Sequence, residues 1–245
     1  MPSGKDFTKK LFSKLGFKVS KLTGIEIIDN DNAYAGMKSL MNHGDQGGVF
    51  FDIGANTGQT LLLLKKYFPD GTIYAFEPGK SAFDELNRNF SSLHKMHVKN
   101  IALGSAEEVK EFFENKVSTM SSFLQLGKDG WGEVIEKTEV RLTTIDQFCQ
   151  NENISRINIL KSDTQGFELE VLGGAREMLR NKPIHFVYLE INFVELYKEL
   201  PTFCDIYNFL NGYGYKLLRF YDFNYYENAV GWGDALFYHP DFNKK

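Results

Sequence analysis

The sequence predicts an α/β fold: a doubly wound, mostly parallel sheet of seven strands, with an antiparallel last strand. From Gly47 onward, strand-like and helix-like segments alternate, which is typical of parallel sheets covered by helices. Val49–Ile53 is a short apolar run that leads directly into a glycine-containing turn. Ile184–Ile191 is a continuous apolar run, as expected for a strand that is buried on both faces.

Each further element follows from its apolar pattern and its punctuation. The expected strands are Val49–Ile53, Thr72–Phe76, Met96–Leu103, Ile157–Leu160, Ile184–Ile191, Tyr215–Phe220 and Ala235–Tyr238. The expected helices are Gln59–Phe68, Ser81–Phe90, Thr143–Asn151, Phe167–Arg180 and Pro201–Leu210. Two short strands, Val109–Phe113 and Glu139–Leu142, are expected around a polar loop at 118–132.

The bulk properties favour a single enzyme-sized domain. The 245 residues allow one full core, which we expect at 47–245, with a lysine-rich helical appendage at 1–46. A formal net charge of −4 argues against a nucleic-acid partner. Cys149 and Cys204 fit no metal or redox spacing and indicate reduced core thiols in a cytoplasmic protein. Neither a membrane span nor a signal peptide is expected.

The appendage carries lysines on one side of a helical pattern and apolar residues on the other, between Lys5 and Leu22. Such a helix can pack on the domain and keep its lysines in water. It can also make peripheral contact with an anionic membrane surface. The sequence leaves both alternatives open, and it does not indicate the oligomeric state.

The turn after the first strand predicts a ligand site. Asp52, Gly54, Ala55, Asn56, Thr57 and Gly58 follow the pattern D-x-G-x-x-x-G between a strand and a helix. Asn56 stands where a dinucleotide fingerprint needs its middle glycine. An adenosyl ligand without a pyrophosphate, S-adenosylmethionine, is therefore favoured. Asp52 could meet its amino group, while Asn56 and Thr57 could bind its carboxylate near a helix N-terminus.

Two further segments fit the same ligand. Glu77 follows the second strand, where a carboxylate can accept hydrogen bonds from both ribose hydroxyls, and Pro78 then turns the chain away. Ile101 and Ala102 end the third strand and could flank an adenine ring. Plain packing at the strand end explains these two residues equally well.

A second polar group is expected on the neighbouring strand. Lys161 and Asp163 lie at its mouth, and Glu190 ends the strand after that. Asp163 could simply cap the following helix, or it could face the methyl acceptor. In the second case Asp163 is the first candidate for the general base and Glu190 the second, while Lys161 could tune Asp163 or bind an acidic acceptor group.

These segments resemble a known family. FFDIGANTG, AFEPGKSAFDELNRN, NIALGS, the Thr-Thr-Ile-Asp segment that ends at 146 and KSDTQGFELEVLGGA are together similar to the FkbM family of S-adenosylmethionine-dependent methyltransferases, over residues 49–214. The family commonly shows K-I-D-V-E-G-x-E-x-x-V-L-x-G in the last segment. Here Ser162 replaces the usual Ile and Gln165 the usual Glu.

The resemblance implies a Rossmann-like class I methyltransferase fold and O-methylation of a sugar, glycolipid or natural-product hydroxyl. No metal is expected, because no ligand cluster has metal spacing. A nucleotide-dependent oxidoreductase is the alternative enzyme. A non-catalytic scaffold that binds a nucleotide is the alternative outside enzymes.

Overall fold

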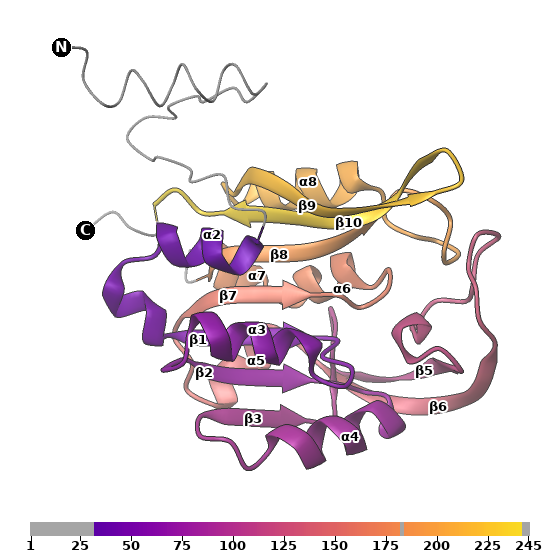
Figure 1. Ribbon diagram of the computed structural model, residues 1–245, viewed down its shortest axis with the longest axis horizontal. Helices are drawn as coiled ribbons and strands as arrows, with labels where there is room; N and C mark the ends of the chain where they lie inside the picture. Colours follow the sequence, from indigo (N-terminus) through magenta and orange to yellow (C-terminus); the bar gives the residue numbers. More distant parts are fainter. Residues whose placement is uncertain (1–31, 182–183, 242–245) are drawn as a thin grey trace.

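The computed structural model describes residues 32–181 and 184–241. Seven strands form one sheet in the order β3-β2-β1-β7-β8-β10-β9 (Figure 1). They are β1 (Val49–Ile53), β2 (Thr72–Phe76), β3 (Met96–Lys99), β7 (Ile157–Ser162), β8 (Ile184–Asn192), β9 (Lys216–Tyr226) and β10 (Ala229–Tyr238). The first five of these strands pair in parallel, and β10 is antiparallel to both β8 and β9. The predicted fold class is confirmed.

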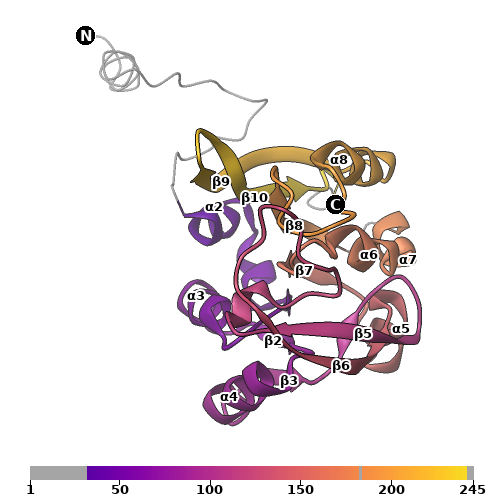
Figure 2. The ribbon, with the colours of Figure 1, turned by 90° about the vertical axis from the view of Figure 1, so that its right-hand side faces the viewer.

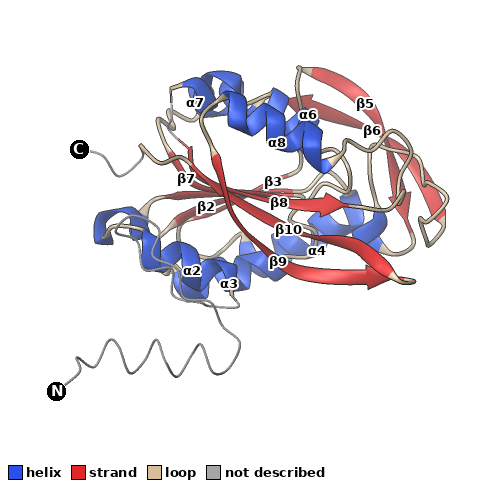
Figure 3. Ribbon diagram, turned by 90° about the horizontal axis from the view of Figure 1, so that it is seen from above, coloured by secondary structure: helices blue, strands red, loops and turns tan. Residues whose placement is uncertain are grey.

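Helices cover both faces of this sheet. Figure 3 shows α2, α3 and α4 on one face and α6, α7 and α8 on the other. The helices are α2 (Ala33–Leu40), α3 (Gln59–Tyr67), α4 (Lys80–Phe90), α5 (Ile145–Asn151), α6 (Glu168–Gly173), α7 (Arg176–Arg180) and α8 (Phe203–Gly212). The prediction of a single helix at 167–180 is wrong, because the helix is interrupted at Gly174, between α6 and α7. A Cβ there would lie 2.0 Å from the carbonyl oxygen of Gly104.

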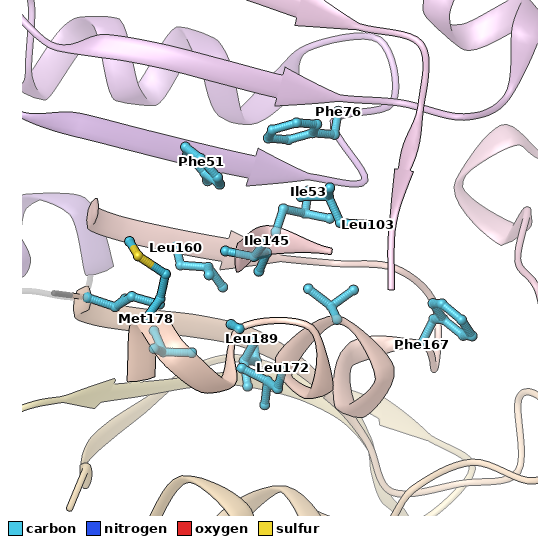
Figure 4. Packing of buried hydrophobic residues seen from close by; sticks show 14 of the residues in the cluster. Phe51, Ile53, Phe76, Leu103, Ile145, Leu160, Phe167, Leu172, Met178 and Leu189 are labelled. Atoms are coloured by element: carbon cyan, nitrogen blue, oxygen red, sulfur yellow. The ribbon is translucent and has the colours of Figure 1, made fainter. Parts of the chain in front are cut away.

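The core lies in two layers, one on each face of the sheet. Successive residues of a strand point to opposite faces. Phe50 therefore packs with α3, whereas Phe51 and Ile53 pack on the opposite side. Figure 4 shows this second layer, where Leu160 of β7 lies near Leu172 of α6. The same alternation points Asp52 towards the layer beneath α2 and α3.

The short strands predicted at 109–113 and 139–142 are present, but their assembly into a second, separate three-stranded sheet was not predicted. It consists of β4 (Ala102–Leu103), β6 (Val134–Thr143) and β5 (Glu108–Asn115), in that order. The strand expected at 96–103 is wrong because it is divided at Asn100, whose amide donates to the carbonyls of Glu77 and Pro78. The chain after Asn100 pairs with β6 instead. This sheet lies at the carboxyl end of the parallel strands, the end that faces the viewer in Figure 2.

The expected amphipathic helix within 1–31 lies outside the described residues. The part of the appendage that is described packs on the domain, since Tyr34 and Met37 of α2 are buried in the layer that contains α3. The boundary at residue 46 stays a prediction. No helix in the described ranges is long and apolar enough to cross a membrane. Cys149 is buried as expected, but Cys204 is exposed on α8, so the expectation of two core thiols is half wrong.

Candidate active site

A pocket opens at the carboxyl ends of β1, β2 and β7, beneath the second sheet. Its empty volume, including the open solvent at its mouth, is about 820 Å³. It lies where the strand order reverses, between β1 and β7, as open α/β folds require. The lining includes nine of the predicted residues: Gly54, Ala55, Asn56, Glu77, Pro78, Ile101, Ala102, Lys161 and Asp163.

Four predicted residues do not line the pocket: Asp52, Thr57, Gly58 and Glu190. Gly58 has a φ of +102° and supports the turn by packing, because a Cβ there would lie 2.3 Å from the ring of Phe90 in α4. Asp52 is completely buried, one layer below the lining. Both residues shape the site without reaching its surface.

The glycine turn is pressed against the loop that follows β7. Gly54 has a φ of +79°, and a Cβ at this position would lie only 2.0 Å from the carbonyl oxygen of Asp163. The backbone N–H of Asp163 in turn donates to the carbonyl of Ile53 at 3.0 Å. Gly54 is therefore needed so that two loops of the protein can touch, which brings Asp163 beside the turn.

Glu77 is the anchor of the turn. Its side chain is buried, and its two carboxylate oxygens accept the backbone N–H groups of Asn56 and Gly79, each at 2.8 Å. Asn56 has a φ of +47°, which directs its N–H towards Glu77. Burial raises the pKa of Glu77 to about 7, and the two backbone hydrogen bonds oppose this rise. A carboxylate has about four lone-pair sites, so acceptor capacity for a ligand remains.

Lys161 lies between two carboxylates. Its Nζ is 3.3 Å from Asp52 Oδ1 and 3.4 Å from Asp163 Oδ2. Burial alone lowers the pKa of Lys161, but the charges of Asp52 and Asp163 outweigh burial and the net shift is upward. Lys161 is therefore a fixed cation that neutralises Asp52 and also pairs with Asp163.

Asp163 does not cap the next helix. The N-cap of α6 is Phe167, which makes no side-chain cap hydrogen bond. Glu168 Oε1 instead accepts the N–H of Thr164 at 2.7 Å. The two oxygens of Asp163 are engaged by Lys161 and by Gln165 Nε2, and about a third of its side chain is exposed to the pocket side. The capping interpretation is wrong.

Glu190 reaches the site through Gln165. Gln165 Nε2 donates to Asp163 Oδ1 and to Glu190 Oε2, both at 2.8 Å, while its Oε1 accepts the hydroxyl of Tyr197 at 2.8 Å. Burial, and after it the charge of Asp163, raises the pKa of Glu190 well above its ordinary value. The two predicted acid–base candidates are thus joined by one amide.

The apolar walls were largely missed by sequence reasoning. Phe112 comes from β5, Phe123 from the loop before β6, and Phe167 from the turn before α6. Phe112 and Phe123 lie with ring centroids 4.9 Å apart, and Phe123 and Phe167 with centroids 4.8 Å apart. For this part of the wall, the sequence predicted only a polar loop at 118–132. Its Ser118 Oγ donates to the side chain of Asn56 at 3.3 Å.

The chain is similar in sequence to known proteins. The model of the methyltransferase FkbM domain matches residues 52–217. The 2-O-methyltransferase NoeI of Sinorhizobium fredii is 24% identical over 165 residues, which are 62% of this chain and 67% of the relative. The hexuronic acid methyltransferase AglP of Haloferax volcanii is 23% identical over 159 residues, 64% of this chain and 61% of the relative.

A crystal structure of methyltransferase FkbM from Methylobacillus flagellatus has the same fold. It superimposes with a TM-score of 0.52 at 17% identity, over 78% of this chain and 43% of that one. The chain spans between 56% and 67% of the length of the curated relatives that it matches. With a family model that covers well over half of its residues, this chain belongs to the methyltransferase FkbM domain family.

Proposed function

We propose that the protein is an S-adenosylmethionine-dependent O-methyltransferase that methylates a hydroxyl of a sugar, glycolipid or natural product. One observation carries the proposal: the carboxylate of Glu77 and the partly exposed carboxylate of Asp163 line the same pocket. Glu77 suits a ribose, and Asp163 suits a hydroxyl that must lose a proton. The ribose site and the base would then share one pocket.

The pocket residues fit S-adenosylmethionine. Glu77 would hold the ribose, and the apolar wall with Ile101 and Ala102 would hold the adenine. Gln59 and Thr60 line the pocket from the first turn of α3, whose free N–H groups favour a carboxylate. Asp52 is buried and already faces Lys161, so we propose that it supports the ligand's charged end through Lys161.

When bound, S-adenosylmethionine supplies an electrophilic methyl group for in-line displacement. The protein must then align the acceptor oxygen and accept its proton. Asp163 Oδ is our candidate for the proton acceptor, Lys161 orients that carboxylate, and Glu190 is the second candidate for the base. The phenylalanine wall would exclude water from this edge of the pocket.

A sugar-like polyol is the acceptor that the surroundings favour. The relatives include a 2-O-methyltransferase and a hexuronic acid methyltransferase. Trp131 and Trp232 lie with ring centroids 5.3 Å apart, and Trp232 packs against the cluster that contains Tyr197. Indole rings can stack on sugar faces. Tyr197 in turn donates to Gln165, so the tryptophan pair borders the network of carboxylates.

Titration calorimetry with S-adenosylhomocysteine and with NAD tests the donor. Among the described residues that line the pocket, Lys161 alone carries a basic side chain, and it is paired with two carboxylates. A pyrophosphate would therefore find little compensation for its charge. Binding of S-adenosylhomocysteine alone supports the proposal. Binding of NAD alone would favour an oxidoreductase. Binding of S-adenosylhomocysteine, together with no methyl transfer to any acceptor offered, would favour a scaffold.

A methyl-label screen against glycans, glycolipids and polyketide-type alcohols tests the acceptor. Transfer to a hydroxyl supports the proposal, whereas transfer only to nucleic acid would overturn it.

We further propose a cytoplasmic location and no nucleic-acid partner. Deletion of residues 1–21 tests the membrane alternative, because vesicle flotation must be lost with the lysines if that segment binds lipid.

A further inference from the structure

Gln165 is fully engaged by its surroundings. Its two amide hydrogens go to two carboxylates, its amide oxygen accepts from Tyr197, and its backbone carbonyl accepts the hydroxyl of Ser122 at 2.7 Å. The residue has a φ of +56°, so the turn holds it in the left-handed region that side chains rarely adopt. Such a conformation persists only where the surroundings fix it.

The orientation of the amide follows from its partners. The nitrogen side faces Asp163 and Glu190, which only accept hydrogen bonds when ionised. The reverse orientation would place an oxygen against both carboxylates. The hydroxyl of Tyr197 can donate, so it satisfies the oxygen side. One amide nitrogen therefore donates one hydrogen to each of the two carboxylates.

Other ionisable groups surround the pair, and they set the background charge. Lys161 of β7 lies beside Asp163, and three further carboxylates belong to β1, α6 and β10. The groups that face Asp163 and Glu190 are Lys161, Asp52, Glu168, Asp234 and Tyr197. Lys161 is the single cation among these described groups. Repulsion between carboxylates at this site is thus balanced by one ammonium and one amide.

We propose that Gln165 is a positioning residue that holds Asp163 ionised and aimed into the pocket as the proton acceptor. It does so by donating one hydrogen bond to Asp163 and a second one to Glu190. The inference rests on the proposed function, since it assigns a role within that site. A carboxylate at position 165 could supply at most one hydrogen, and only when protonated, so it would add charge where the amide relieves it.

The direct test is a carbon-13 NMR titration of the side-chain carboxyls in the ligand-free protein. In Gln165→Glu, the carboxyl titration of the cluster around position 165 is expected to move up by about one pH unit, because like charges disfavour ionisation. Gln150→Glu is the matched control, because it adds the same charge at an exposed site of α5. Gln165→Leu, which removes the donor without adding charge, serves if the first variant does not fold.

Kinetics give a second readout. The acid limb of kcat is expected to move up by the same amount in Gln165→Glu, while the control keeps the wild-type profile. A folded Gln165→Glu or Gln165→Leu variant whose carboxyl titration and kcat profile both match those of the wild type would overturn the role of Gln165. The NMR result does not depend on which methyl donor the protein uses, because the titration is done without ligand. Failure of the wild type to bind S-adenosylhomocysteine would instead overturn the proposed function.

Discussion

Lys161 Nζ lies 3.3 Å from Asp52 Oδ1, and the two residues are direct partners in the pairing of β7 with β1. The side chains point to the same face of the sheet and are both buried. A buried ion pair adds little net stability, because the cost of removing both charges from water offsets their mutual attraction. Removal of one partner is costly, because the other charge then stays buried alone.

Lys161→Met is therefore expected to destabilise the protein by about 3–5 kcal/mol. Methionine keeps most of the length of the side chain but leaves Asp52 and Asp163 without their cation. Urea unfolding monitored by fluorescence measures the loss. Lys128→Met is the matched control, since Lys128 makes an exposed ion pair with Glu195 at 3.8 Å, which is worth about 0–1 kcal/mol. Equal losses in the two variants would contradict a structural ion pair.

Gly54→Ala is expected to cost about 3 kcal/mol, because it combines backbone strain with a clash. The φ of +79° disfavours any Cβ, and the neighbouring atom is the backbone oxygen of Asp163, which cannot rotate away. Thermal unfolding followed by circular dichroism gives the measurement. In Gly212→Ala, the added Cβ would meet no atom within 4 Å outside its own stretch of helix, so stability should stay unchanged or rise slightly. A harmless Gly54→Ala would mean that the two loops are not in contact.

Glu77 makes ligand affinity depend on pH. Its pKa of about 7 means that the carboxylate becomes ionised between pH 6 and pH 8. The ionised form is the better acceptor for ribose hydroxyls, so affinity for S-adenosylhomocysteine should rise about tenfold over that interval. Glu77→Ala should bind about 10-fold to 100-fold more weakly at pH 8 and lose most of this slope. Calorimetry at three pH values measures both effects.

Glu85→Ala is the control for that series, because Glu85 is exposed on α4, a short distance along the chain from Glu77. It should keep the wild-type affinity and the wild-type slope. Circular dichroism must show that Glu77→Ala is folded, since Glu77 also holds the N–H groups of Asn56 and Gly79. A folded variant with undiminished affinity would remove Glu77 from the ligand site.

Much of this site could be predicted from short segments of sequence. The end of β1 and the end of β2 each carry their polar residue directly after an apolar run, and parallel strands bring such ends to one edge. The same logic predicted that Lys161 and Asp163 lie on the strand next to β1, which is confirmed. The local order of residues was sufficient because all three strands are parallel and adjacent.

Other contacts depend on pairings that no local pattern records. The ion pair of Asp52 with Lys161 requires the register of β1 against β7. The bridge from Gln165 to Glu190 joins residues 25 positions apart. The phenylalanine wall requires the second sheet, and its strand β4 is only two residues long. Short strands and side-chain meetings of this kind are fixed by tertiary packing, so the periodicity of the sequence did not indicate them.

His185 gives the protein an acid sensitivity that is independent of the pocket. It lies buried in β8, and burial first, then the charge of Arg156, lowers its pKa to about 3. In the unfolded chain the pKa returns to about 6.5. Between these two values the unfolded chain binds a proton that the folded protein does not, so this histidine favours unfolding as pH falls from 6.5 towards 3.

At pH 5 the contribution of His185 to that loss is expected to be about 2 kcal/mol. His185→Gln removes the titrating group. Between pH 7.5 and pH 5, the free energy of unfolding of this variant should therefore fall by about 2 kcal/mol less than that of the wild type. Urea unfolding at the two pH values gives this difference, in which any constant cost of the substitution cancels. The exposed His94 provides the control, because His94→Gln should keep the acid sensitivity of the wild type. If His185→Gln kept it as well, the loss would have to come from another buried group.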